Sequence, residues 1–352
     1  MPARCLTALR PACAARLCLF ATVVALSAPA GPASAAGVDE KPVDLEAAAV
    51  SFAPFSSATE RFGGLEWRGG IEIDSDHENF GGYSGLVLSK DGTKLVAVSD
   101  RGWWFTADVA YDGDRLSGIA NGRTARLLGP GGKRFKGNHR QDAEGLSAYG
   151  PKGTSGDLLV AFERRERILR YRFGRHGFKA RPKTIRLPRD ARRAKYNKEL
   201  EAVARFGKGT QLAGTIIALS ERFLDKKGNI RGWLIGGRRP GPIAIRRTED
   251  FDITDMAILP GGDVLVLERR FSVITLAGMR IRRIAHKDIR RNAVLDGEVL
   301  LQANQPTRTI DNMEGIAVHR SPGGELRITI ISDDNFNPVQ RTLLLQFALA
   351  KD

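Results

Sequence analysis

Five segments of the chain share one two-strand pattern. Each begins with a short strand, headed in four cases by an acid, and after a glycine turn continues into an apolar run that ends on an acid. The first strands begin at Ser84-Gly85-Leu86, Glu144-Gly145-Leu146, Glu201-Ala202-Val203, Asp255-Met256-Ala257 and Glu314-Gly315-Ile316. The apolar runs end at Asp100, Glu163, Glu221, Glu268 and Asp333. Because one such unit cannot bury both of its faces alone, the pattern predicts a fold in which copies stack side by side.

The repeated unit has the signature of a β-sheet. In the clearest copy, Gln141–Phe173, a third segment alternates apolar residues with Arg170 and Arg172, which is the period-two pattern of a half-exposed strand. No long helical pattern separates the copies, and their irregular spacing disfavours a solenoid. We therefore predict an all-β fold, a β-propeller. Five repeats are visible, and a last strand at Thr342–Leu349 is expected to pair with strands before Gly81 and close a sixth blade.

The N-terminal segment Met1–Ala35 resembles a secretory signal peptide, with three arginines, an apolar run and a small-residue cleavage site at Ala33-Ser34-Ala35. We expect residues 36–50 to be a flexible lead-in and residues 51–352 to form a single propeller domain. All three cysteines lie inside the leader, so the mature chain would have no disulfide and no thiolate catalysis. The predicted location is periplasmic or secreted, and no segment is long enough to span a membrane as a helix. We expect a monomer.

The recurring acids are predicted to meet at one mouth of the propeller. Consecutive strands of a blade are antiparallel, so the start of the first strand and the end of the second lie at the same end. This places four pairs of acids side by side, and Asp100 opposite Ser84. The pairs are Glu144 with Glu163, Glu201 with Glu221, Asp255 with Glu268, and Glu314 with Asp333. Adjacent strands lie about 4.8 Å apart, and carboxylates that close cannot all ionise without a countercharge.

Two countercharges are available. One is arginine, since Arg101, Arg164, Arg222 and Arg269 each follow a second-strand acid. The other is a hard divalent cation such as Ca²⁺, which takes several carboxylate and carbonyl oxygens. Three interpretations stay open: the acid–arginine pairs lock neighbouring blades together, they form a metal and phosphate site, or they belong to an unrelated binding surface.

For an enzyme, the sequence predicts a set of roles at this mouth. The candidate ligands for one or more divalent cations, with Ca²⁺ expected, are Glu144, Glu163, Glu201, Glu221, Glu314, Asp100 and Asp333. A cation there would lower the pKa of a water molecule and make it the nucleophile. The candidate receivers of the phosphate oxygens are Arg101, Arg164 and Arg222. Glu144 is the acid whose loss should abolish hydrolysis.

The net charge of +15 is compatible with a solvated basic surface or with attraction to a small anionic, phosphorylated substrate. Nucleic acid is not expected, because basic clusters such as Arg189–Lys195 and Arg280–Arg283 lack aromatic stacking partners. The segment Gly82-Tyr83-Ser84-Gly85-Leu86 departs from the G-x-S-x-G pattern of serine esterases, and the histidines lack the spacing of a zinc site.

At these residues the chain resembles the phytase-like, or esterase-like, family of exported bacterial propellers. The matching elements are Asp142-Ala143-Glu144-Gly145-Leu146, Glu201-Ala202-Val203-Ala204, Asp311-Asn312-Met313-Glu314-Gly315-Ile316, Ser99-Asp100-Arg101-Gly102 and Phe162-Glu163-Arg164. The resemblance spans about Phe62–Phe347 and implies a six-bladed propeller. More distantly, the chain is similar to β-propeller phytases, which implies calcium-dependent phosphomonoester hydrolysis at an acidic channel mouth. Their dense calcium ligand set is not matched residue by residue, and Ser84 replaces the first-strand acid of the first unit.

Two functions from different classes follow. The first is an exported, divalent-metal-dependent phosphoester hydrolase that acts on an anionic phosphorylated substrate. The alternative is a non-catalytic propeller that binds an anionic ligand or a protein partner of the cell envelope.

Overall fold

The computed structural model describes residues 38–56, 60–137, 140–164, 167–191, 200–272 and 276–350. The predicted signal peptide, Met1–Ala35, lies outside the described residues. Within those ranges, no helix has the length and apolar character needed to cross a membrane. The described helical segments are all short: α1 (Phe173–His176) and 3-10 turns at Pro130–Gly132, Gly153–Ser155, Gly177–Lys179 and His286–Asp288.

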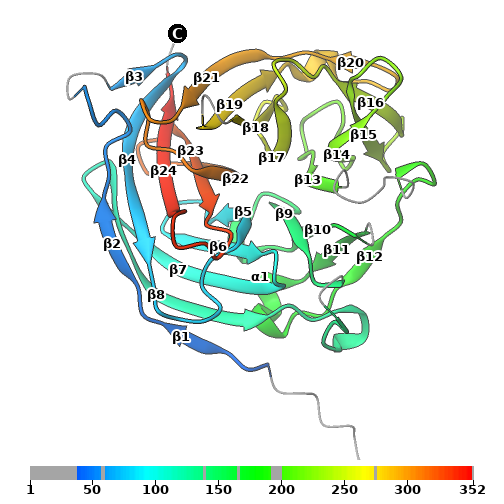
Figure 1. The fold of residues 1–352 in the computed structure, drawn as a ribbon. Helices are drawn as coiled ribbons and strands as arrows, with labels where there is room; N and C mark the ends of the chain where they lie inside the picture. The colour runs from blue at the N-terminus through cyan, green and yellow to red at the C-terminus, as the bar shows by residue number, and fades with distance from the viewer. Residues whose placement is uncertain are drawn as a thin grey trace, which may run out of the picture. The chain divides into compact units, whose positions relative to one another are not determined.

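The described strands form five sheets around a common axis (Figure 1). From the axis outward, the first sheet contains β5 (Tyr83–Leu88), β6 (Lys94–Ser99), β7 (Trp103–Asp112), β8 (Arg115–Arg126) and β1 (Lys41–Val43). The second contains β9 (Ala143–Ala148), β10 (Leu158–Phe162), β11 (Arg167–Tyr171) and β12 (Lys183–Ile185). The third contains β13 (Leu200–Arg205), β14 (Ile216–Leu224), β15 (Ile230–Ile235), β16 (Gly241–Ile245) and β20 (Val294–Leu295).

The fourth sheet contains β17 (Asp252–Ile258), β18 (Val264–Ser272), β19 (Leu276–Ile284) and β21 (Glu298–Asn304). The fifth contains β22 (Asn312–Arg320), β23 (Leu326–Asp333), β24 (Thr342–Leu349), β4 (Leu65–Asp74) and β2 (Glu46–Ala49), with β3 (Arg61–Phe62) paired to β4. Each innermost strand contacts the innermost strands of both neighbouring sheets. The five sheets are therefore blades of one closed propeller, and we number them in this order.

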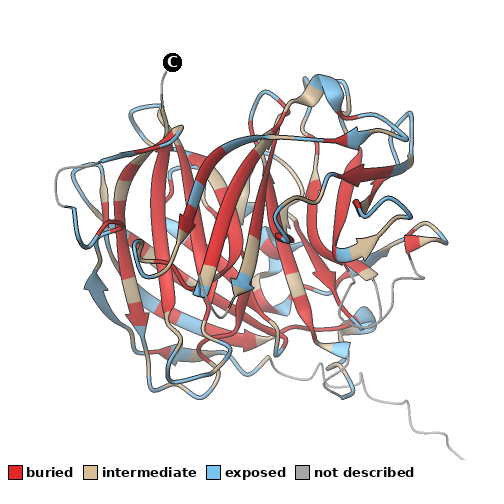
Figure 2. Cartoon of the chain, turned by 45° about the horizontal axis from the view of Figure 1, so that its top comes forward, coloured by how far each residue is buried: buried red, intermediate tan, exposed pale blue. Residues whose placement is uncertain are grey.

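The core is divided among the seams between blades. One cluster of buried apolar side chains lies in each of the five seams of the described structure. Between the first and second blades, for example, Trp104 packs edge-on against Tyr171 with ring centroids 5.1 Å apart. Figure 2 shows that buried residues follow the strands, whereas exposed residues concentrate in the connections. Because a fully buried Leu, Ile or Phe side chain contributes roughly 2 kcal/mol, burial between blades accounts for the stacking that the repeats predict.

The structure confirms the all-β propeller and differs in the number of blades. The described residues form five sheets, and none of them is a sixth blade. The predicted pairing between the two ends of the chain is present, because β24 pairs with β4 through partners such as Leu344 and Ile71. This pair completes the fifth blade instead of building another. The reason is that the fifth unit supplies only β22, β23 and β24, so its open edge takes β4.

The predicted flexible lead-in is wrong for residues 41–49, which form two strands. Strand β1 pairs with β8 at the outer edge of the first blade, where Pro42 faces Arg123. Strand β2 pairs with β4 at the outer edge of the fifth blade, where Ala48 faces Glu72. The segment therefore bridges two neighbouring blades across the seam at which the ring closes, and it covers edges that would otherwise be unpaired.

Breaking the pairing of β2 should weaken this closure. The double variant Ala47→Pro/Ala48→Pro removes two backbone N–H groups from the strand, and we expect it to lower the melting temperature by roughly 4–6 °C, corresponding to about 2 kcal/mol. The matched variant Ala47→Ser/Ala48→Ser should change the melting temperature little, because every side chain of β2 is exposed. Equal melting temperatures for the two variants in thermal unfolding would show that the β2 pairing contributes nothing.

Candidate metal centre

A β-bulge recurs at the same place in all five innermost strands. In each blade the register between the first and second strands skips one residue of the first strand. The skipped residues are Ser84, Glu144, Glu201, Thr254 and Glu314. A bulge leaves its extra residue outside the ladder and re-aims its side chain. We call these five residues the bulge positions.

A second set of equivalent positions lies at, or one residue beyond, the last second-strand residue that pairs with the innermost strand. The residue before each bulge pairs with a second-strand residue, and the next residue along that strand occupies the strand-end position. The strand-end positions are Asp100, Glu163, Glu221, Arg269 and Asp333. Bulge and strand-end positions together hold seven carboxylates, which we call the acid ring. The acid ring consists of Glu144, Glu201, Glu314, Asp100, Glu163, Glu221 and Asp333, the same seven acids that the sequence predicts as metal ligands.

The acids of the ring act on one another electrostatically. Burial raises the pKa of Glu144 and of Glu201 well above the usual range, and other carboxylates of the ring raise both pKa values further. Burial also raises the pKa of Asp333, with a further contribution from Glu314. Burial raises the pKa of Asp100 to about 6. These shifts are those of carboxylates gathered away from water with too little positive charge nearby, so the ring favours a cation.

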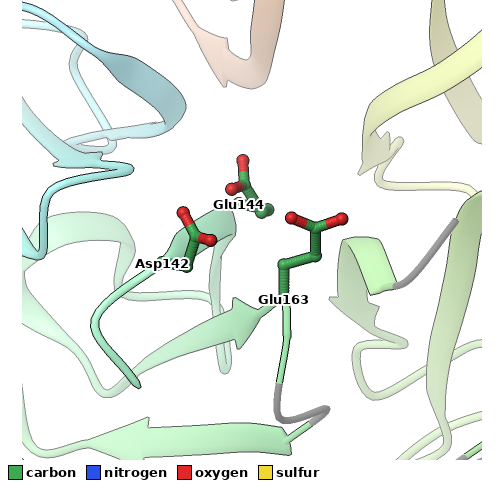
Figure 3. Close-up of side chains that lie close together, drawn as sticks. All are labelled: Asp142, Glu144 and Glu163. Atoms are coloured by element: carbon green, nitrogen blue, oxygen red, sulfur yellow. The ribbon is translucent and has the colours of Figure 1, made fainter. Parts of the chain in front are cut away.

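Three carboxylates come close enough to share one ion. Asp142, Glu144 and Glu163 each offer an oxygen, and these oxygens all lie within 4.8 Å of one another. Figure 3 shows the three carboxyl groups directed toward a common space, with Asp142 and Glu144 at the start of β9 and Glu163 just after β10. Ca²⁺–oxygen distances of about 2.3–2.6 Å allow two ligands of one ion to be up to about 5 Å apart. The three residues therefore fit a hard divalent cation.

Asp142 is a candidate ligand that the sequence reasoning did not select. Asp142 is part of the Asp142-Ala143-Glu144 motif, of which only Glu144 was predicted to be a ligand. The signal that could have found it is the spacing of two residues, which puts both acids on the same side of an extended chain.

The three predicted phosphate-binding arginines lie beside this mouth in different surroundings. Arg164 contacts Asp142, with Nε 2.6 Å from Oδ2. Arg222 forms an ion pair with Asp252 of the fourth blade. The guanidinium of Arg101 lies over the ring of Phe336, 3.2 Å from its centroid. Arg164 and Arg222 are thus engaged with carboxylates, whereas Arg101 makes no ion pair within the described part of the chain.

Residues 78–336, more than half of the chain, match the model of the Phytase-like family, described as "Esterase-like activity of phytase". The chain belongs to this family. A comparison with curated proteins gives no match.

Among solved structures, the phytase-like chain is similar to the β-propeller domain of Cps50 (Swd1) from Myceliophteria thermophila. The two share 8% identity and a TM-score of 0.37, over 88% of this chain and 100% of that one. A chain of a mitotic checkpoint complex shares 14% identity and a TM-score of 0.38, over 96% and 99% of the two chains. Raptor from Chaetomium thermophilum shares 10% identity and a TM-score of 0.39, over 88% of this chain and 29% of that one.

The fourth blade of the phytase-like propeller corrects one predicted pair of acids. Thr254, not Asp255, occupies the bulge position, so the sequence alignment of the repeats is one residue out of step there. Asp255 lies at the position that three other blades fill with glycine, is fully buried, and accepts a hydrogen bond of 2.9 Å from the backbone N–H of Ile316. Glu268 is 0% exposed and faces away from the ring toward Arg280 and Arg282 on β19. The predicted pairing of Asp255 with Glu268 is therefore wrong.

The glycines at the equivalent position have a steric cause. A Cβ on Gly145 would lie 2.0 Å from the backbone oxygen of Glu201, and one on Gly315 would lie 2.9 Å from the Cα of Gly85. The innermost strands of neighbouring blades therefore approach each other at these residues more closely than a side chain permits. This approach brings the bulge positions of adjacent blades next to one another.

Arg269 takes the strand-end position of the fourth blade, where the other four blades have an acid. Its Nη1 donates to the Asn312 Oδ1 at 2.6 Å and to the Glu314 carboxylate, and its Nη2 donates to the Glu221 Oε1 at 3.4 Å. The sequence reasoning placed Arg269 after a strand-end acid, beside Arg101, Arg164 and Arg222. The register shows instead that Arg270 is equivalent to those arginines and that Arg269 belongs to the ring.

Proposed function

We propose that this phytase-like propeller is a divalent-metal-dependent phosphoester hydrolase that acts at the mouth of its channel, with Ca²⁺ as the expected cation. The observation that carries this proposal is the cluster of Asp142, Glu144 and Glu163, whose oxygens approach within 4.8 Å of one another. Membership of the family described by the esterase-like activity of phytase supports a hydrolase. The raised pKa values in the acid ring support a cation, because a positive charge would relieve the repulsion among its carboxylates.

The residues of the chain have separable roles in this proposal. Asp142, Glu144 and Glu163 would hold the cation, and the remaining carboxylates of the acid ring would keep the mouth strongly negative around it. A bound divalent cation supplies Lewis acidity, which lowers the pKa of water and neutralises phosphate oxygens. Arg101 is the arginine best placed to receive the substrate, because its exposed guanidinium stacks on Phe336 and has no ion pair in the described structure. Its planar fork suits two phosphate oxygens.

The substrate class follows from charge. An acidic mouth repels a bare phosphate, so a phosphoester would bind there only with the cation and an arginine in place. The net charge of +15, or +12 without the three arginines of the leader, favours approach of an anionic substrate from solution. A periplasmic or secreted location, cleavage after Ala35 and a monomeric state are also proposed, on the basis of the sequence alone.

Glu144→Gln tests the proposal, because it removes one charge from the cluster and keeps the shape of the side chain. With millimolar Ca²⁺, the wild type should hydrolyse p-nitrophenyl phosphate, and the variant should lose about 100-fold or more of that activity. Ca²⁺ should raise the melting temperature of the wild type and leave that of the variant unchanged. The control is Glu325→Gln, the same change at a residue that pairs with Arg68 away from the mouth, and it should keep both responses.

Two outcomes contradict the phosphoester hydrolase. One is a wild type that has no activity on p-nitrophenyl phosphate with Ca²⁺ present but hydrolyses p-nitrophenyl acetate, which would indicate a carboxyl esterase. The other is a wild type without turnover of either ester whose melting temperature still responds to Ca²⁺. That result would support the alternative function, a non-catalytic propeller that binds an anionic ligand or an envelope protein.

A further inference from the structure

The charge of the acid ring is unevenly distributed, because Arg269 places one positive charge among its carboxylates. Four of the five strand-end positions carry an acid, whereas the fourth blade carries a guanidinium. Through its two terminal nitrogens Arg269 reaches Glu221 of the third blade and Glu314 of the fifth blade, and it also binds the Asn312 amide oxygen. Arg269 therefore links the two blades that flank its own and supplies positive charge to their carboxylates.

Glu201 is the bulge acid of the same third blade, and Arg269 acts on it through charge without a hydrogen bond in the described structure. The Glu201 side chain is 7% exposed, and within the described part of the chain no basic side chain comes close enough to donate a hydrogen bond to it. Its backbone abuts Gly145, directly after Glu144, so Glu201 adjoins the cluster of Asp142, Glu144 and Glu163. The arginine beside this cluster, Arg164, approaches Asp142. A buried carboxylate that makes no hydrogen bond, next to three converging acids, points to a ligand that brings further positive charge.

We propose that Arg269 is a tethered cation that limits the acid ring to one divalent ion. In this arrangement the guanidinium takes the place of a second ion between Glu221 and Glu314, and the single divalent ion is held by Asp142, Glu144 and Glu163, with Glu201 as a further ligand. The inference rests on the proposed metal-dependent function for the first ion, and it adds the stoichiometry and the residue that fixes it.

The physical basis is the exchange of one cation for another. Glu221 and Glu314 with the amide oxygen of Asn312 form an oxygen set suited to Ca²⁺ once the guanidinium is removed. Neutralising Arg269 would also leave two carboxylates close together without a countercharge, which destabilises the protein until a cation binds. A variant without this charge should therefore gain a cation site that the wild type does not have.

The test counts Ca²⁺ ions bound per chain by calorimetric titration and by competition with a chromophoric chelator. We expect one ion for the wild type and two for Arg269→Gln. Arg269→Lys keeps the charge and should bind one. Arg270→Gln is the matched control, because it removes the same charge from the neighbouring residue, which pairs with Glu249 outside the ring, and it should also bind one.

Melting temperatures give a second readout. Without divalent ions Arg269→Gln should melt below the wild type, and saturating Ca²⁺ should raise its melting temperature by more than it raises that of the wild type. If Arg269→Gln alone does not fold, the double variant Arg269→Gln/Glu314→Gln removes one charge of each sign. It should fold and bind one ion.

Each possible pair of ion counts either supports or overturns the inference. One ion in both the wild type and Arg269→Gln, with equal affinity, overturns it. Two ions in the wild type overturn it while leaving the proposed hydrolase intact. No ion in the wild type and one in Arg269→Gln support the tethered cation and overturn the metal-dependent function. No ion in either protein overturns both.

Discussion

Replacing Glu268 with glutamine is expected to lower the free energy of unfolding by about 3–5 kcal/mol. Glu268 is fully buried and binds two arginines that are themselves almost completely buried. Arg280 donates through Nε at 2.7 Å, and Arg282 donates through Nε at 2.8 Å and through Nη2. Removing the carboxylate charge leaves two guanidinium groups in the interior of the fourth blade without their common partner. Chemical denaturation followed by circular dichroism would measure the loss.

Glu201→Gln is the matched comparison, because it is the same substitution at another buried glutamate. Glu201 makes no hydrogen bond to a basic side chain in the described structure, and its charge is repelled by neighbouring carboxylates, foremost that of Glu144. In protein stripped of divalent ions, Glu201→Gln should therefore leave the stability unchanged or increase it. A similar loss of stability in both variants would show that the two carboxylates have the same structural role, contrary to the positions described above.

Protein free of divalent ions should be less stable at pH 7.5 than at pH 5. Burial raises the pKa of Asp100 to about 6 and raises the pKa of Glu144 and Glu201 well above the usual range. A carboxyl group with a raised pKa binds its proton more tightly in the folded state. Its contribution to stability is therefore full at low pH and is lost as the pH rises through the folded-state pKa. We expect the melting temperature to fall by about 5 °C or more across this range, and saturating Ca²⁺ to abolish the fall.

His319 has the opposite effect on this profile and needs a control. Burial lowers its pKa to about 4, so the folded state holds the neutral imidazole and loses stability as the pH falls below about 6.5. Measuring His319→Gln alongside the wild type separates the two contributions, and the fall with rising pH should be steeper in the variant. A melting temperature that rises between pH 5 and pH 7.5 in metal-free His319→Gln would contradict the assignment of the raised pKa values to the acid ring.

The sequence was sufficient to predict the features of the fold and site that depend on a local pattern of residues. Apolar runs between a glycine turn and an acid identify the two innermost strands of every blade, and the antiparallel pairing of those strands places Glu144 near Glu163. The same reasoning predicted that nine acids meet at one mouth; seven of them occupy the equivalent positions of the acid ring, whereas Asp255 and Glu268 do not. It also predicted that the ends of the chain pair, as β4 and β24 do.

The wrong predictions concern the pairing of strands, which the sequence of a single strand does not reveal. The bulge at Thr254 is a property of two strands together, so the repeats could be aligned one residue wrongly and Asp255 taken for a bulge acid. The same shift hid Arg269 and assigned Glu268 to the mouth. The predicted sixth blade is wrong because the sequence does not show which strand takes the open edge of β24. The predicted flexibility of residues 41–49 is wrong because their partner strands are distant in sequence.

The pairing of β4 with β24 sets the order in which the molecule can be completed. Ribosomes make β4 well before β24, so one flank of β4 has no neighbour until β24 has been made. Contacts between residues so far apart along the chain form slowly, because a long loop must first be closed. The synthesis of β24 thus decides when β4, made long before it, can reach its final place in the fifth blade.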